Sequence, residues 1–180
     1  MDEGLTQKAL RIATQMHDGQ LRKETPIPYI THPVAVALNL AKHGFAENVI
    51  AAALVHDVLE DTNMTRALLE KELGVEVVTI VMSLSEDKSL PWEERKRNYI
   101  ETIRSSDANV KAVSIADKIH NAESMLIAYS IQGENLWQMF ARGKQQQQWF
   151  MNELLAMFEE TWDHPLNSEY RKLVEAICRL

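Results

Sequence analysis

The chain has 180 residues, of which 46% are hydrophobic and 25% charged, and it contains only six glycines and five prolines. This composition excludes a disordered, collagen-like or linker-rich chain, and the length predicts one domain over residues 1–180. The formal net charge of −7 argues against a broad basic surface for nucleic acid. An anionic ligand therefore needs a local basic cluster or a metal ion.

The cysteine content and the N-terminal sequence predict the cellular compartment of the protein. Cys178 is the one cysteine, so it cannot form an intramolecular disulfide and needs no oxidising surroundings. The N-terminus begins acidic and has no long apolar run, unlike a signal peptide. No stretch approaches the ~20 apolar residues of a membrane span. We therefore expect a cytoplasmic protein that contacts neither membrane nor nucleic acid.

Apolar residues recur at three- and four-residue spacing along nearly the whole chain, which predicts an all-α fold. Gly19, Pro26 and Pro28 interrupt this spacing and predict a loop over 19–30, and a second, polar loop is expected over 85–97. The expected helices cover residues 4–18, 31–43, 47–62, 64–73, 75–84, a stretch through 99–103, 108–128, 133–161 and 167–179.

Ionisable residues interrupt otherwise apolar helices at three separate places in the chain. They are His32, His56, Asp57, Glu60, Asp61 and Asp117. The acids at 60 and 61 lie at the C-terminal end of the helix expected over 47–62, where they oppose the helix dipole. Residues that oppose the local structure without a visible compensating contact are typical of functional sites.

The types of these residues indicate a metal centre. Two imidazoles and two carboxylates, from His32, His56, Asp57 and Asp117, suit a first-row divalent ion that keeps open positions for water. Such an ion polarises a phosphoryl oxygen and lowers the pKa of a bound water from ~15.7 toward ~7. Glu60 or Asp61 could position that water or shuttle its proton. The pattern therefore favours metal-assisted hydrolysis.

Structural roles are the alternative for several of these residues. A single His-Asp pair is common as a buried, hydrogen-bonded structural pair. His17 and His43 are expected to be structural or at the surface, His164 lies in a loop, and His120 either supports a metal ligand or packs in the core. Taken by themselves, the basic residues at 22–23 and 95–97 are expected to be solvated surface charge.

Four segments together resemble a known family. They are HDGQLRKETPIPYITHPVAVA, AAALVHDVLEDT, EDKSLPWEERKR and IADKIHN, and their order and spacing are similar to those of the HD-domain hydrolases of the RelA/SpoT-homologue alarmone enzymes. The small, stand-alone hydrolases of the Mesh type are the most similar branch. The resemblance covers about residues 5–125, and residues from about 130 to 180 form a C-terminal helical extension of the same domain.

The resemblance implies a single HD-domain helical bundle that binds Mn²⁺. It implies removal of the 3′-pyrophosphate from a purine alarmone, (p)ppGpp to GDP or GTP plus pyrophosphate. The implied metal ligands are His32, His56, Asp57 and Asp117, and the implied water-activating acids are Glu60 and Asp61. The implied substrate contacts are Arg22 and Lys23 beside the nucleotide, Lys88, Arg95 and Lys96 near the phosphates, and Asn121 near the ribose.

One departure from the family pattern leaves the purine base of the substrate undetermined. Relatives commonly continue from the asparagine at 121 with an apolar residue and an arginine, whereas this chain has Ala122 and Glu123. We expect guanosine ahead of adenosine, with (p)ppApp-type alarmones and the 2′-phosphate of NADPH as alternative substrates. A non-catalytic nucleotide sensor is a further alternative, against which the acids Glu60 and Asp61 argue.

Overall fold

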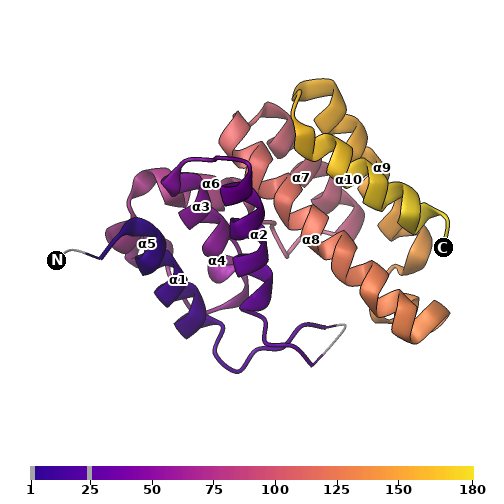
Figure 1. Cartoon of the computed structure of the whole chain (residues 1–180), viewed down its shortest axis with the longest axis horizontal. Helices are drawn as coiled ribbons and strands as arrows, with labels where there is room; N and C mark the ends of the chain where they lie inside the picture. Colours follow the sequence, from indigo (N-terminus) through magenta and orange to yellow (C-terminus); the bar gives the residue numbers. More distant parts are fainter. Residues whose placement is uncertain (1–2, 24–25) are drawn as a thin grey trace.

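The computed structural model describes residues 3–23 and 26–180, and within these ranges the chain forms helices and loops without a strand (Figure 1). This confirms the all-α prediction. The helices are α1 (Leu5–Met16), α2 (Thr31–Lys42), α3 (Glu47–Leu54), α4 (Val58–Asp61), α5 (Arg66–Leu73), α6 (Val75–Leu84), α7 (Trp92–Ser105), α8 (Ala108–Gln132), the 3₁₀ helix η1 (Gly133–Met139), α9 (Gly143–Thr161) and α10 (Pro165–Cys178). None of the helices so described is long and apolar enough to cross a membrane.

Helix α8 lies at the centre of the bundle. It packs against α2, α3 and α6 from the first half of the chain and against α7, η1 and α10 from the second half, as Figure 1 shows. Asp107 caps its N-terminus by accepting hydrogen bonds from the backbone N–H groups of Asn109 and Val110. The polar residues Lys111, Ser114 and Asp117 of α8 are buried among the helices that pack against it.

The helix expected over 47–62 is wrong as one continuous element. Helix α3 ends at Leu54, and residues 55–57 form a turn before the short α4. Side chains of consecutive residues in a helix diverge by about 100°. The turn instead lets His56 and Asp57 converge, with Nε2 of the histidine 3.1 Å from Oδ2 of the aspartate. The break is therefore what brings both side chains to one point.

Two other predicted boundaries also differ from the structure. The helix expected over 133–161 is divided into η1 and α9, and Gly143 at the start of α9 adopts a φ of 70° that L-residues rarely take. Gly133, with a φ of 57°, separates α8 from η1. Helix α7 begins at Trp92, directly after Pro91, so the segment 85–97, which the sequence predicts as a polar loop, is partly helical. Arg95 and Lys96 consequently lie on a helix.

The loop over 19–30 is held by local backbone pairing. Leu21 and Pro28 form an isolated antiparallel bridge, and the N–H of Tyr29 donates to the carbonyl of Gln20 at 2.8 Å. The pairing returns the chain to the start of α2 and places Tyr29 beside the candidate ligands. Residues 24 and 25, at the tip, lie outside the described residues.

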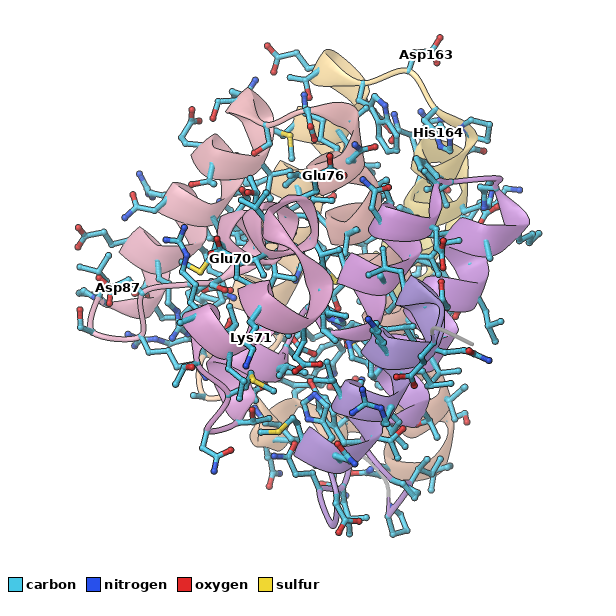
Figure 2. All side chains as sticks on the ribbon, turned by 90° about the vertical axis from the view of Figure 1, so that its left-hand side faces the viewer. Glu70, Lys71, Glu76, Asp87, Asp163 and His164 are labelled. Atoms are coloured by element: carbon cyan, nitrogen blue, oxygen red, sulfur yellow. The ribbon has the colours of Figure 1, made fainter. Side chains whose placement is uncertain are left out.

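His43 and His164, which lie away from the candidate metal ligands, make contacts that stabilise the fold. His164 caps α10 by accepting from the N–H of Leu166 at 3.3 Å, and its ring stacks on Trp162 at a centroid distance of 4.4 Å. Figure 2 shows this turn, with Asp163 and His164, at one end of the molecule. His43 lies 3.1 Å from Glu169 and therefore links α2 to α10.

The α9–α10 layer contributes to the stability of the fold. Leu154 on α9 is completely buried, whereas Ile131 on α8 is 72% exposed. We expect Leu154→Ala to lower the free energy of unfolding by about 2–5 kcal/mol, because it removes buried methyl groups and leaves a cavity. Ile131→Ala, the exposed control, should change it by less than about 0.5 kcal/mol. Urea denaturation of both variants measures this, and equal losses would contradict the burial of α9.

Candidate metal centre and substrate cavity

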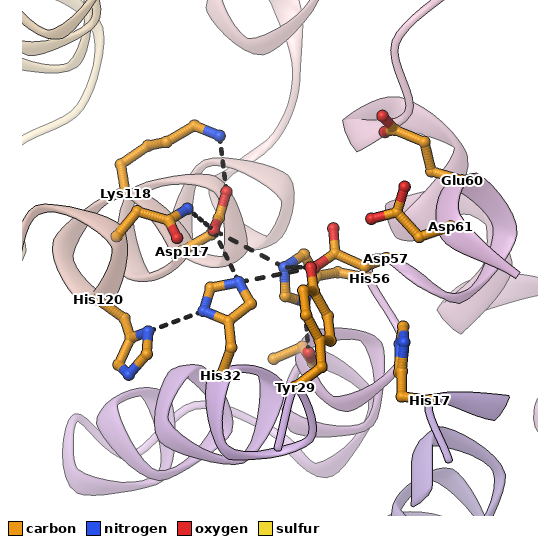
Figure 3. Close-up of polar contacts among 12 residues, drawn as sticks. His17, Tyr29, His32, His56, Asp57, Glu60, Asp61, Asp117, Lys118 and His120 are labelled. Atoms are coloured by element: carbon orange, nitrogen blue, oxygen red, sulfur yellow. Dashed lines mark hydrogen bonds and ion pairs between the residues drawn. The ribbon is translucent and has the colours of Figure 1, made fainter. Parts of the chain in front are cut away.

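Two histidines and two aspartates from distant parts of the chain meet between α2, the turn at 55–57 and α8 (Figure 3). His32 Nε2 lies 3.1 Å from Asp117 Oδ1 and 3.6 Å from Asp57 Oδ2. His56 Nε2 lies 3.1 Å from Asp57 Oδ2 and 3.8 Å from Asp117 Oδ1. The nitrogens and oxygens therefore face one another across a small space.

The orientation of His56 fits a cation in that space. Its Nδ1 lies 2.7 Å from the carbonyl oxygen of Ala53, which can only accept, so we assign the Nδ1 proton to this hydrogen bond. In neutral imidazole, Nε2 then carries a lone pair. That buried atom faces two carboxylates and makes no aligned hydrogen bond. A lone pair aimed at negative charge is favourable only when a cation or a proton lies between them.

His120 orients His32 much as the Ala53 carbonyl orients His56. The Nδ1 atoms of the two rings lie 2.8 Å apart, so one must donate to the other. Burial and the neighbouring His32 lower the pKa of His120 to about 4, so His120 is neutral and can accept. Donation from His32 Nδ1 leaves its Nε2 as the lone pair that faces Asp57 and Asp117. Sequence reasoning left the role of His120 open, and the structure brings it into contact with a candidate ligand.

The electrostatics describe an anionic centre that attracts a cation. Burial opposes a charge on His56, but Asp57 and Asp117 more than offset it and raise its pKa well above the usual value. Burial opposes the charges of the two aspartates as well. Even so, the pKa of Asp57 is lowered by His56 and that of Asp117 by Lys118. In the absence of metal, His56 therefore holds a proton between two ionised carboxylates.

Further donors orient the carboxylates. Tyr29 donates its hydroxyl to Asp57 Oδ2, and Asn121 donates its amide to Asp117 Oδ1. Lys118 Nζ lies 2.6 Å from Asp117 Oδ2. Such contacts around metal ligands fix their orientation and tune the site. His32, His56 and Asp57 offer ligand atoms within 4.8 Å of one another, and Asp117 approaches from α8, so the group fits a divalent ion.

The proton on His56 predicts how metal affinity depends on pH. Metal binding must displace this proton, so below the raised pKa of His56 the apparent affinity should fall about tenfold for each unit of pH. The fall should begin above ~6.5, the value for free histidine. The pKa of His32 is lowered by burial, so His32 adds no proton near neutrality. Calorimetric titration with Mn²⁺ at several pH values measures this, and a pH-independent affinity would contradict it.

Glu60 and Asp61 lie on α4 beside the metal centre, held together by one lysine. Lys88 Nζ lies 3.2 Å from Glu60 Oε1 and 2.8 Å from Asp61 Oδ1. Figure 3 shows the two acids beyond Asp57 and away from the histidines. Glu60 lines the cavity at the metal centre, whereas Asp61 is not among its lining residues. Of the two acids, Glu60 is therefore the better placed to reach a water in the cavity.

The cavity above the centre has a volume of about 270 Å³ and a strongly polar wall. Of the substrate contacts implied by the sequence, Lys23, Lys96 and Asn121 line it, and Arg22 reaches its edge by donating to Asn121 Oδ1 at 3.0 Å. Arg95 does not line this cavity. It pairs with Glu86 at 2.9 Å and lines a separate one. Lys88, which is paired with Glu60 and Asp61, does not line the metal-centre cavity either, so the structure places neither Arg95 nor Lys88 with the other implied contacts.

Two residues of this site were missed in the sequence, and Glu123 does not line the cavity. Tyr29 and Lys118 both line the cavity and both contact a candidate ligand. Their signal was position, since Tyr29 lies two residues before the start of α2 and Lys118 follows Asp117. Glu123 is not among the residues that line the cavity, and the charges that affect its pKa are Glu169 and Lys42. The effect of Glu123 on the choice of purine therefore stays a prediction.

The sequence matches a known family. A family model for the HD domain matches residues 9–145. The guanosine-3′,5′-bis(diphosphate) 3′-pyrophosphohydrolase MESH1 of Xenopus tropicalis is 38% identical over 127 residues, which cover 69% of this chain and 71% of that protein. The MESH1 protein of Danio rerio is 37% identical over 121 residues, which cover 66% and 67%. The chain therefore belongs to the HD-domain hydrolase family.

Solved structures agree with this assignment. A Listeria monocytogenes protein, lmo0812, superposes with a TM-score of 0.77 at 38% identity and covers 85% of this chain and 97% of its own. A metazoan orthologue of SpoT, described as hydrolysing ppGpp, superposes with a TM-score of 0.81 at 26% identity and covers 100% and 99%. Because the second match spans the whole chain, the helices after residue 130 have counterparts in that enzyme.

Proposed function

We propose that this protein is a metal-dependent hydrolase that removes the 3′-pyrophosphate of (p)ppGpp, giving GDP or GTP and pyrophosphate. One observation carries the proposal: the imidazole nitrogens of His32 and His56 face the carboxylates of Asp57 and Asp117 beneath a polar cavity with basic residues. The relatives named for this activity support it. The proposed location is the cytoplasm.

The four side chains, His32, His56, Asp57 and Asp117, would hold the ion, which we propose to be Mn²⁺. When bound, such an ion supplies Lewis acidity to a phosphoryl oxygen and makes a water more acidic. Nitrogen and carboxylate ligands suit a first-row divalent ion, and His120, Tyr29 and Asn121 orient those ligands.

The remaining chemistry falls to residues of the cavity wall. Glu60 would accept a proton from the attacking water, and Lys88 keeps Glu60 beside Asp61. The ammonium groups of Lys96 and Lys118 face the same cavity and would neutralise charge on the phosphate chain. A carboxylate held at the cavity and cations opposite it provide the proton acceptor and the electrostatic stabilisation that water attack at phosphorus needs.

A substrate comparison tests the proposal. Purified protein is stripped of metal and assayed with ppGpp, ppApp and NADPH, with and without added Mn²⁺. We expect pyrophosphate release from ppGpp that depends on the ion, with a higher kcat/KM than for ppApp and no comparable release of phosphate from NADPH. Turnover of NADPH alone, or ppGpp hydrolysis that is unchanged after metal removal, would contradict the proposal.

A further inference from the structure

Helix α4, which carries Glu60 and Asp61, is too short to fix its own position. It contains four residues, of which Val58 is the buried one. Isolated helices this short are not stable in water, and the last carbonyl groups of a helix find no partner within it. The place of the two acids therefore depends on the side chains that bind the carbonyl groups of α4.

Among the described residues, three side chains donate to carbonyl groups of α4. They are Thr62 to Val58 at 2.6 Å, Lys88 to Glu60 at 3.1 Å and Gln20 to Asp61 at 3.2 Å. Thr62 directly follows α4, and Lys88 lies in the exposed loop before α7. Gln20 is therefore the donor that joins α4 to the loop between α1 and α2.

His17 fixes the orientation of the Gln20 amide. The carbonyl of Asp61 can only accept, so the amide nitrogen of Gln20 faces it and the amide oxygen faces His17. Because that oxygen lies 2.8 Å from His17 Nδ1, we assign the Nδ1 proton to this hydrogen bond. His17 is buried, and its ring packs on Tyr29 at a centroid distance of 4.7 Å. Figure 3 shows His17 beside Tyr29, on the side of the metal centre where Glu60 and Asp61 lie.

Gln20 reaches the metal centre through its backbone as well. Its carbonyl accepts from the N–H of Tyr29 at 2.8 Å, and the Tyr29 hydroxyl donates to Asp57 Oδ2. The side chain of Gln20, by contrast, binds the end of α4. One residue is thus connected to a candidate metal ligand by its backbone and to the acids by its side chain. Together the two connections set the separation between the metal centre and Glu60.

We propose that His17 and Gln20 are positioning residues that hold Glu60 where it can accept a proton from the attacking water. This inference rests on the proposed function, in which Glu60 is the proton acceptor. Neither His17 nor Gln20 is among the residues that line the cavity at the metal centre, so both act through α4 and not on the substrate. Exact placement of a reacting group contributes strongly to rate, which gives such a contact a large effect on kcat.

Gln20→Met tests the proposal, because methionine has a similar length and lacks the amide. We expect kcat for ppGpp with Mn²⁺ to fall about tenfold, while KM and the affinity for Mn²⁺ change by less than about twofold. The loop keeps its backbone pairing, and Asp57 keeps its bond to Tyr29. Gln15→Met, at an exposed position of α1, is the matched control and should retain wild-type kcat. A wild-type kcat in Gln20→Met would overturn the proposal.

Two variants of His17 separate positioning from packing. His17→Phe keeps a ring against Tyr29 without a donor, whereas His17→Asn keeps an N–H donor near the place of Nδ1 and loses the ring. We expect kcat to fall about tenfold in His17→Phe and to be largely restored in His17→Asn. A residue that serves packing alone would give the opposite order. In the Glu60→Gln background, Gln20→Met should cause no further loss, because its effect passes through Glu60.

Amide hydrogen exchange separates this inference from the proposed function. In metal-free protein without substrate, the N–H groups of α4 should exchange at least about fivefold faster in Gln20→Met than in the wild type, because the end of α4 opens more often. Mass spectrometry of a peptide that contains residues 58–62 measures this, and Gln15→Met should match the wild type. If the wild type does not hydrolyse ppGpp, the proposed function fails, and exchange alone then decides whether Gln20 holds α4. Equal exchange of α4 in Gln20→Met and the wild type would overturn the inference at any level of activity.

Discussion

Replacing Asp57 with alanine is expected to remove the bound metal and to abolish hydrolysis. Asp57 Oδ2 lies within 3.6 Å of both candidate histidine ligands, and its charge, with that of Asp117, raises the pKa of His56 in the metal-free site. Loss of a contact around a ligand costs about 10–100-fold in affinity, so loss of a ligand itself should cost more than about 100-fold. Asp117→Ala should have the same effect, because Asp117 closes the group from α8.

The metal content and the fold are measured separately for these variants. Elemental analysis gives the metal content per chain, and circular dichroism checks that the helices remain. Asp87→Ala is the matched control, since Asp87 lies in an exposed loop and its side chain bonds only to Ser89 in the described contacts. Figure 2 shows Asp87 at the outer edge of the molecule. Unchanged metal occupancy in Asp57→Ala would rule out the assigned ligand set.

Glu60→Gln combined with Asp61→Asn is expected to stop turnover while the metal remains bound. Neither acid contacts the candidate histidines, and an amide cannot accept a proton from water. General acid–base catalysis contributes about 10²–10⁴-fold, and kcat should fall by that factor. Because Glu60 lines the cavity and Asp61 does not, Glu60→Gln alone should account for most of the loss.

A second pair of adjacent acids provides the control for this double variant. Glu159→Gln with Glu160→Gln makes the same chemical change on α9, where the two acids form exposed ion pairs with Arg171 and Arg104. This control should retain wild-type kcat. If the double variant at 60 and 61 also turns over at the wild-type rate, a different group accepts the proton.

The sequence predicted the helices and the identity of the candidate ligands better than their geometry. Helical periodicity is a local signal, and it runs without interruption through the apolar residues before His56. The turn at 55–57 is stabilised by contacts that no local pattern contains, such as those of Asp57 with Tyr29 and His32. For this reason the sequence could name the residues of one metal centre, whereas it could not predict the turn that orients His56 and Asp57.

A second cavity, of about 290 Å³ and lined by residues of α8, α9 and α10, could not be predicted from the sequence for a related reason. Its lining joins Lys96 and Lys118 to Phe150 and Tyr170, which lie far along the chain in segments without a recognisable motif. An apolar or aromatic residue at helical spacing predicts a buried face, and it does not show what that face contacts. Only the packing of α9 and α10 shows that this face reaches the wall of the metal-centre cavity.

The bond that is cleaved provides the most direct test of the central claim. Hydrolysis of ppGpp by the wild type with Mn²⁺ in ¹⁸O-labelled water should give GDP and pyrophosphate in equal amounts, with one labelled oxygen in the pyrophosphate and none in GDP. Both products are quantified by ion-exchange chromatography and mass spectrometry. Stepwise release of orthophosphate, or label in the nucleotide, would contradict attack of water at the phosphorus that is bonded to the 3′ oxygen.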